Sequence, residues 1–318
     1  MHLQKLFSWL LILVFMSAIV AGCGAPGLTA IEFIPQDANL MASIQLSKII
    51  NDQDLRDAYA EFESEPGQSQ TLEDALDEFA GETGIDLRDF SEAVIFADIT
   101  TIEHADYMGA IIEGSFNETQ FISSIEREAG QEFATSYYKG YKLYTDEWEE
   151  FGISFLTSSV LILGTMEAVK DAIDVSKGDR EQIGGIIVDT YNRLGDGLIK
   201  SAFEVPEEAR QALTEELMPG EIPISLGAFA DIDIVGFALE KEAETINIQI
   251  IPHFLSTDSA QDAKDTLNGT ISLFKGMVEV PEIKELLGKV EVSAAESWLT
   301  IALEINKSEM EQLTETFQ

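Results

Sequence analysis

A long-range repeat within the sequence sets the strongest limit on how this chain can fold. Phe96-Ala-Asp-Ile99 recurs as Phe229-Ala-Asp-Ile232. After each copy, the hydrophobic pattern predicts another strand, a capped helix, further strands and a closing helix. Corresponding segments lie about 133 to 139 residues apart, a drift that loops of different length can absorb. We therefore expect two similar units in tandem rather than one large core.

The order of the expected elements indicates the α+β class. Each unit is expected to follow the order β-α-β-β-α-β-β-α, with a mostly antiparallel sheet covered by helices on one face. We place the first unit at residues 35–180 and the second at residues 185–318. Strands are predicted at residues 40–46, 93–99, 107–114 and 153–163, and at 198–205, 245–251, 288–290 and 297–303, with a hairpin turning at Lys139-Gly140. Helix starts are predicted at Asn51, Thr71, Asn117, Thr165 and Ser308.

The first residues of the chain have the pattern of an export signal. Lys5 precedes an apolar run from Leu6 to Val20, which is shorter than the roughly 20 residues that span a bilayer as a helix. We therefore expect residues 1–22 to be a cleaved signal peptide. An uncleaved membrane anchor and a secreted form without lipid remain as alternatives.

The end of this run resembles the lipobox of bacterial lipoproteins. The motif is Val20-Ala21-Gly22-Cys23, and Cys23 is the only cysteine in the chain, so no disulfide can form within it. The resemblance implies that the Cys23 thiol is diacylated and that the chain is cut just before it. Residues 23–34 are then a lipidated cysteine and a tether. The expected location is the outer face of the cytoplasmic membrane or the cell envelope, with the lipid on Cys23 as the contact to the membrane.

The charge of the chain excludes one class of partner. Acidic residues outnumber basic ones 58 to 19, and removal of residues 1–22 leaves a net charge of −40. Such a chain is repelled by nucleic acid and by anionic lipid headgroups, so no nucleic-acid partner is expected. The charge can serve solubility or gather cations such as calcium. We favour solubility, because the acids are scattered over helix faces.

Three motifs extend the resemblance beyond the signal peptide. Pro35-x-Asp37-Ala38, Thr83-Gly-Ile-Asp-Leu87 and Gly164-Thr-Met-Glu-Ala-Val-Lys-Asp-Ala-Ile173 resemble a family of bacterial secreted and lipid-anchored proteins built on a domain of unknown function. The resemblance covers nearly all of the mature chain. The motifs mark loops and helix starts, so it implies no functional residues.

Motifs with catalytic or metal-binding spacing are weak. Ser136-Tyr-Tyr-Lys139 and Ser272-Leu-Phe-Lys275 match Ser-x-x-Lys without the companion motifs of penicillin-recognising enzymes. The segment from Asp231 to Glu242 has the spacing of a calcium loop, but its alternating pattern predicts a strand. Glu103, His104 and Asp106 could bind a metal, although a solvated turn is the favoured interpretation. His253 follows a proline at a strand end and is interpreted as structural.

An aromatic group between residues 137 and 155 is the best candidate for a recognition surface. Aromatic side chains are common at ligand and protein interfaces, and we place the surface at Tyr138, Tyr141, Tyr144 and Trp148. The whole group consists of Tyr137, Tyr138, Tyr141, Tyr144, Trp148, Phe151 and Phe155. The alternative, which we favour, is a hairpin packed on the core of its own unit.

Together these patterns predict a non-enzymatic envelope lipoprotein that acts as a binding or structural module. No cofactor, metal ligand or catalytic residue is predicted, and the ligand is expected to be a protein or a small molecule. Two alternatives stay open: an enzyme of unrecognised class with a site between the two halves, and a calcium-responsive acidic surface module.

Overall fold

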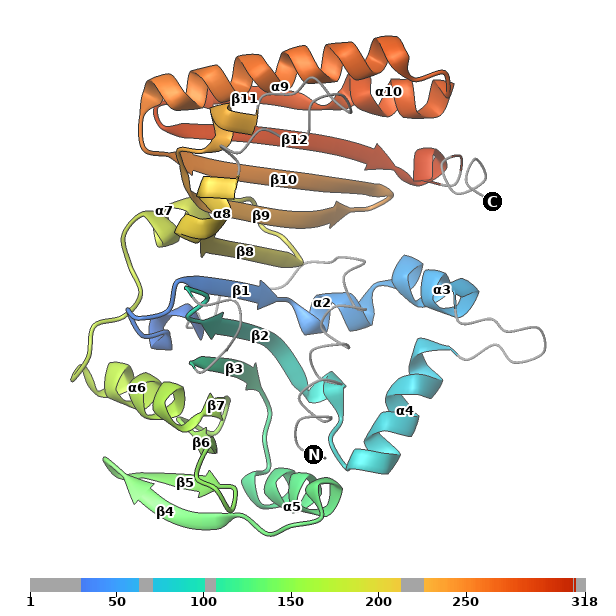
Figure 1. The fold of residues 1–318 in the computed structure, drawn as a ribbon. Coiled ribbons are helices and arrows are strands. Elements are labelled where there is room, and N and C mark those ends of the chain that lie inside the picture. Colours follow the sequence, from blue (N-terminus) through green and yellow to red (C-terminus); the bar gives the residue numbers. More distant parts are fainter. Residues whose placement is uncertain (1–29, 63–70, 101–106, 213–225, 311, 313–318) are drawn as a thin grey trace. The chain divides into compact units, whose positions relative to one another are not determined.

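The computed structural model describes residues 30–62, 71–100, 107–212, 226–310 and 312. These residues group into two compact units (Figure 1). Unit 1 extends to Ile183, apart from Ile99 and Thr100, and unit 2 begins at Gly184. The predicted signal peptide, Cys23 and residues 24–29 of the expected tether lie outside the described residues. No helix in the described segments is long and apolar enough to cross a membrane.

Unit 1 is an antiparallel sheet with helices in its connections, which confirms the predicted α+β class. Its strands follow the order β1-β2-β3-β7-β6-β5-β4. The elements are η1 (Ala30–Phe33), β1 (Leu40–Ile44), α2 (Leu46–Asn51), α3 (Gln53–Phe62), α4 (Leu72–Thr83), η2 (Leu87–Asp89), β2 (Phe90–Ala97), β3 (Met108–Gly114), α5 (Glu118–Ala129), β4 (Ala134–Tyr138), β5 (Tyr141–Thr145), β6 (Phe151–Phe155), β7 (Val160–Thr165) and α6 (Met166–Lys177).

The sheet of unit 1 is covered on both faces, not on one face as predicted. Leu161 of β7 packs in a cluster with Phe121 of α5. The next residue, Ile162, points to the opposite face and is also fully buried. On that second face, a Cβ added at Gly152 would lie 3.6 Å from Val169 of α6. The continuous apolar run of β7 is therefore explained by helices on both sides of the strand.

The predicted strand at residues 153–163 is in fact two strands. β6 and β7 pair antiparallel and are joined by a short turn. The turn is set by small polar residues, because the Ser159 backbone N–H donates to Thr157 Oγ1 at 3.1 Å. Such local hydroxyl contacts favour turns over strand continuation.

Several predicted helix ends are confirmed and one is wrong. Thr71 forms a capping box at the start of α4, Asn117 caps α5, and Gly178 ends α6 in the left-handed conformation. Asn51 does not begin a helix, because it is the last residue of α2. The Asp52 side chain instead accepts the backbone N–H of Leu55 in the first turn of α3.

The folded part of unit 1 includes residues that the sequence assigned to the tether. Ala30 in η1 and Ile34 after it are fully buried. The backbone N–H of Ile183 donates to the carbonyl of Ile34 at 2.8 Å, and Pro35 bridges to Gln182. The start and the end of unit 1 are therefore held together.

The strands of unit 2 are also antiparallel, in the order β8-β9-β10-β12-β11. Its elements are α7 (Ile186–Arg193), β8 (Ile199–Glu204), α8 (Glu207–Ala212), η3 (Leu226–Phe229), β9 (Ile232–Glu242), β10 (Thr245–Phe254), α9 (Thr257–Met277), α10 (Pro281–Lys289), β11 (Glu291–Ala295) and β12 (Trp298–Asn306).

The predicted alignment of the two units is wrong in detail. Phe96 and Ala97 end β2, whereas Phe229 lies in η3, before β9 begins at Ile232. The strand predicted at residues 288–290 begins later than predicted, because Gly288 and Lys289 belong to α10 and β11 begins at Glu291. The final helix predicted from Ser308 lies largely outside the described residues.

Candidate functional site

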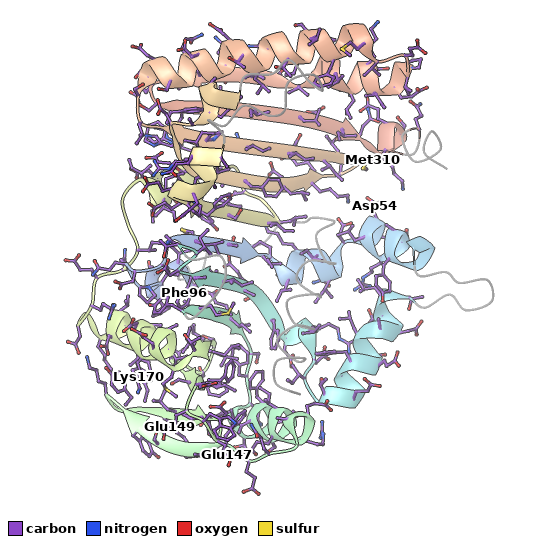
Figure 2. All side chains as sticks on the ribbon, viewed as in Figure 1. Asp54, Phe96, Glu147, Glu149, Lys170 and Met310 are labelled. Carbon is purple, nitrogen blue, oxygen red and sulfur yellow. The ribbon has the colours of Figure 1, made fainter. Side chains whose placement is uncertain are left out.

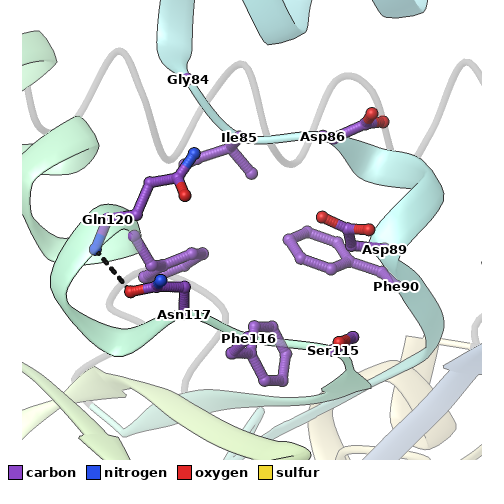
Figure 3. A pocket seen from close by; sticks show the side chains of 10 residues that line it. Gly84, Ile85, Asp86, Asp89, Phe90, Ser115, Phe116, Asn117 and Gln120 are labelled. Carbon is purple, nitrogen blue, oxygen red and sulfur yellow. Dashed lines mark hydrogen bonds between the residues drawn. The ribbon is translucent and has the colours of Figure 1, made fainter.

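A pocket in unit 1 lies where the loop after α4 meets the connection from β3 to α5 (Figure 3). Its volume is about 260 Å³. The floor is formed by Phe90, Phe116 and Phe121, with ring centroids 5.5 Å apart for Phe90 and Phe116 and 5.9 Å apart for Phe116 and Phe121. These tilted and edge-to-face contacts are favourable for aromatic rings. Phe90 and Phe121 are buried members of the core of unit 1 and Phe116 packs against them, so the floor of the pocket is the edge of that core.

The rim of the pocket carries some polar side chains that have hydrogen-bond partners and some that have none among the described residues. Asp86 and Asn117 already have partners, because Asp86 accepts from Arg88 and Asn117 Oδ1 accepts the backbone N–H of Gln120. The side chains of Asp89, Ser115 and Gln120 have no hydrogen-bond partner among the described residues. All three are exposed, so their polar groups are free to exchange water for a ligand. A few convergent polar groups around an apolar floor are typical of a ligand site.

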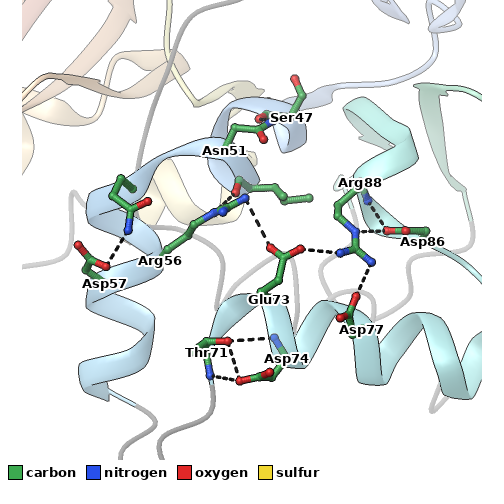
Figure 4. Close-up of polar contacts among 12 residues, drawn as sticks. Ser47, Asn51, Arg56, Asp57, Thr71, Glu73, Asp74, Asp77, Asp86 and Arg88 are labelled. Atoms are coloured by element: carbon green, nitrogen blue, oxygen red, sulfur yellow. Dashed lines mark hydrogen bonds and ion pairs between the residues drawn. The ribbon is translucent and has the colours of Figure 1, made fainter.

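An ion-pair network fixes one wall of the pocket (Figure 4). The Arg88 guanidinium contacts Asp86 at 2.8 Å and reaches Glu73 and Asp77 of α4, both at 2.7 Å. The hydrogen bond from Arg88 is the main cause that lowers the pKa of Asp86 below its ordinary value. The network ties the loop of residues 84–86 to α4, and so positions the rim.

One wall of this pocket carries a sequence motif. Gly84, Ile85 and Asp86 of the motif Thr83-Gly-Ile-Asp-Leu87 line it. Gly84 adopts a φ of 73°, and a Cβ there would lie 2.5 Å from the Ser124 hydroxyl. The contribution of Phe116 and Phe121 could not be predicted, because they come from a separate segment.

The predicted aromatic group is divided by the structure. Tyr138 and Tyr141 lie on the face of α6: Tyr138 donates to Asp174 Oδ2 at 3.1 Å, and Lys177 lies 4.4 Å from the Tyr141 ring centroid. Tyr144 points to the other face, where it is buried in the core and donates to Glu118 Oε1 at 2.5 Å. These three tyrosines therefore pack within unit 1, as the alternative interpretation has it.

Of the four residues of the predicted surface, Trp148 is largely exposed, as is Tyr137 elsewhere in the aromatic group. Trp148 is 72% exposed and lies in the turn between β5 and β6. Its neighbours in the sequence, Glu147 and Glu149, are labelled in Figure 2. The turn does not bring it together with Tyr138 or Tyr141 in any contact among the described residues. A single four-residue recognition surface is not formed.

In unit 2, His253 has a carboxylate partner. On β10, His253 pairs with Ile234 and Phe254 pairs with Ile232, so a bulge in β9 leaves Asp233 without a partner on β10. Asp233 Oδ1 lies 2.6 Å from His253 Nδ1. The Trp298 ring packs 4.6 Å from the His253 ring, and the Arg193 guanidinium lies 3.6 Å from the Trp298 ring centroid. Within the described residues, no hydroxyl or thiol hydrogen-bonds to His253. This packing supports a structural role.

The weak motifs are not assembled into sites. Lys139 Nζ pairs with Asp174 and Asp179 at 2.9 and 2.8 Å and is thereby drawn away from Ser136. The proposed calcium-loop segment is strand β9. In the part of the chain that the structure describes, no three histidine, cysteine or acidic side chains gather as metal ligands. Glu103, His104 and Asp106 lie outside the described residues.

A polar network joins the two sequence motifs that begin at Pro35 and at Gly164. Arg180 binds Asp37 through Nε at 3.0 Å and Asp171 through Nη1 at 2.7 Å, and the Tyr107 hydroxyl donates to Asp171 at 3.1 Å. Asp171 is buried in α6, and this burial is the main cause that raises its pKa. The network connects Pro35-x-Asp37 to the motif that begins at Gly164, so both are explained by packing.

Glu113 of β3 is a half-buried acid without a full set of partners. Its Oε1 is buried and has no hydrogen-bond partner among the described residues. Burial raises the pKa of Glu113 above its ordinary value of 4.5; a hydrogen bond from the Ala30 backbone opposes the rise, and the charge of Glu32 adds to it.

We expect Glu113→Gln to stabilise the protein at neutral pH. Because the folded-state pKa is raised, the ionised Glu113 destabilises the fold above that pKa, and this penalty is lost as the pH falls to 4.5. Urea unfolding from pH 7 to pH 4 should show a stabilisation that shrinks with acidification. The control Glu128→Gln, at an exposed site on α5, should change stability by no more than about 0.5 kcal/mol. A pH-independent effect of Glu113→Gln would contradict the assignment.

Comparisons with known proteins give matches to solved structures only. No protein-family model matches the chain, and no curated protein matches it significantly. The chain is similar to crystal form IV of TP0453, with a TM-score of 0.47 and 8% identity over 91% of this chain and 97% of that chain. Crystal form III of TP0453 gives a TM-score of 0.45 and 7% identity over 91% and 99% of the two chains.

Proposed function

We propose that the mature protein is a non-enzymatic binding module, anchored outside the cytoplasm by a lipid on Cys23, and that unit 1 carries its ligand site. The observation that carries this proposal is the pocket with a phenylalanine floor and unpartnered polar groups on its rim. Its volume of about 260 Å³ lies below the roughly 300–1,000 Å³ of drug-sized sites. The ligand is therefore a compact group, such as a side chain or a small amine.

The charge of the site favours a ligand with a positive end. The Asp89 carboxylate is unpartnered among the described residues, and the chain as a whole attracts cations because of its net charge of −39. A cation near the floor also gains from the faces of the phenylalanine rings. An amine with an apolar body satisfies both parts of the pocket.

The test of the site uses 2-phenylethylammonium as the probe and the neutral 2-phenylethanol for comparison. Calorimetry on the full mature chain in detergent should show weak binding of both, with the amine bound more tightly. Asp89→Asn should weaken amine binding about fivefold, worth about 1 kcal/mol, and leave the alcohol unchanged. Phe116→Ala should weaken both.

A matched control separates the pocket from the overall charge. Asp196 is exposed in a glycine-flanked loop of unit 2, so Asp196→Asn removes the same charge far along the chain from the pocket residues. If Asp196→Asn weakened amine binding as much as Asp89→Asn, the amine would be held by net charge alone and the proposed site would be wrong.

The lipid anchor has its own test. The support for it is the lipobox resemblance and the single cysteine of the chain. Intact mass spectrometry of the protein extracted from membranes should show a chain that begins at Cys23 and carries a lipid. An unmodified chain that begins at Met1 would contradict the anchor and would leave the pocket proposal untouched.

We also infer that the two units are copies of one ancestral unit. The orders β1-β2-β3-β7-β6 and β8-β9-β10-β12-β11 follow the same connection scheme when the hairpin β4-β5 is set aside. Helices also follow the first and third strand in both units. Superposing the two sheets strand by strand should align the matched strands in one register, and a better alignment with another pairing of strands would contradict the duplication.

A further inference from the structure

Among the described residues, no strand pairs with the outer edge of β4 in unit 1. In the strand order β4 has β5 as its neighbour and lies at the end of the sheet (Figure 1). The two-residue turn at Lys139 and Gly140, with φ of 47° and 90°, makes Tyr138 and Tyr141 a hydrogen-bonded pair. Because such pairs alternate along an antiparallel ladder, the backbone N–H and C=O groups of Thr135 and Tyr137 point away from β5.

This edge lacks the features that usually protect one. No charged residue and no proline occurs from Ala134 to Tyr138. Residues 134–137 are all exposed, and the Tyr137 side chain is 75% exposed. The edge strand of unit 2, β11, differs in both respects, because it begins with Glu291 and α9 packs against its Val292.

We propose that β4 pairs antiparallel with β4 of a second copy of this chain, about a twofold axis at Ser136. Thr135 and Tyr137 would then exchange backbone hydrogen bonds with Tyr137 and Thr135 of the other copy. Each bulky tyrosine meets a small residue in this register, since Tyr137 lies opposite Thr135 and Tyr138 lies opposite Ala134. The serines meet at the centre, where side chains approach most closely.

The charge of the chain favours this strand for a contact between copies. With 58 acidic and 19 basic residues, two copies repel over most of their surfaces, whereas β4 carries no charge. The pairing should therefore strengthen as salt screens the remaining repulsion. A contact held by ion pairs would show the opposite salt dependence. The proposed pairing of β4 is independent of the proposed ligand pocket.

Cysteine cross-linking in the membrane tests the register. The full chain has one native cysteine, so wild type supplies the background. Across the axis, the Cα atoms of two Ser136 residues are expected about 4.5 Å apart, within the range of about 4.4–6.8 Å that a disulfide needs. Mild oxidation of Ser136→Cys should give a covalent dimer on a non-reducing gel.

Two controls make the result specific. Ser293→Cys places a cysteine on β11, at an exposed position of the protected edge, and should give wild-type background. Thr135→Cys should cross-link less than Ser136→Cys, because Thr135 lies opposite Tyr137 and not opposite itself. Equal dimer yields at all three positions, no dimer from Ser136→Cys, or a cross-link to a different protein would each overturn the proposal.

A charge-swap experiment covers the case in which cysteine oxidation is misleading. Ser136→Lys and Ser136→Glu should each abolish the dimer in native mass spectrometry, because like charges then meet at the axis. A mixture of the two variants should form the heterodimer. If the mixture stayed monomeric while wild type formed dimers, Ser136 would not lie at the axis.

Discussion

Replacing Phe96 with alanine should destabilise unit 1 by about 3–5 kcal/mol. Phe96 is fully buried in β2 (Figure 2), and its ring packs against the Tyr107 ring at 6.2 Å. The ring also covers its strand partner Gly109, where an added Cβ would lie 2.4 Å from the Phe96 ring. Removal of the ring therefore leaves a cavity above a residue that has no side chain to fill it.

The same contact predicts the outcome of a double-mutant cycle. Gly109→Ala alone should cost about 1–3 kcal/mol, because its methyl group overlaps the Phe96 ring. In Phe96→Ala/Gly109→Ala the methyl group enters the cavity, so the total loss should fall short of the sum of the two single losses by about 1 kcal/mol. Hydrogen exchange of peptides from β2 and β3 measures these losses within unit 1. Strict additivity would contradict the contact.

Elements with a local signal were predictable from the sequence. Thr71 and Asn117 cap helices through their own neighbours, and the turn at Lys139-Gly140 needs two residues with positive φ. The strand at residues 153–163 was misread because its apolar run is buried on both faces, which removes the alternation that would have marked the turn near Ser159. For this segment, the apolar pattern alone did not locate the turn.

The candidate site could not be predicted from local patterns. Its floor brings Phe90 together with Phe116 and Phe121, and such contacts depend on the packing of α5 on the sheet. The motif around Gly84 marked one wall, but not what faces it. The tyrosines of the hairpin were ambiguous for another reason. An aromatic-rich segment is compatible with a binding surface and with a core, and only the structure places Tyr144 in the core.

Replacing Arg180 with alanine should destabilise unit 1 by about 2–3 kcal/mol at neutral pH, since it leaves Asp171 buried without its cation. The side chain of Asp171 is only 10% exposed. Arg88→Ala is the matched control: it breaks more ion pairs, but its partners Glu73 and Asp77 are 48% and 65% exposed. Such exposed pairs contribute at most about 1 kcal/mol. Urea unfolding of both variants measures the loss of unfolding free energy. A larger loss in Arg180→Ala means that burial of the partner matters more than the number of ion pairs.

The pH dependence separates the two arginines further. Burial already raises the pKa of Asp171 above its ordinary value of 3.8, and loss of Arg180 raises it more. The penalty in Arg180→Ala is therefore full above that pKa and shrinks as the pH falls toward 3.8. Arg88 instead lowers the pKa of Asp86, so the loss in Arg88→Ala should persist down to pH 3.8 and shrink only below it. Identical pH profiles for the two variants would mean that Asp171 is not held ionised by Arg180.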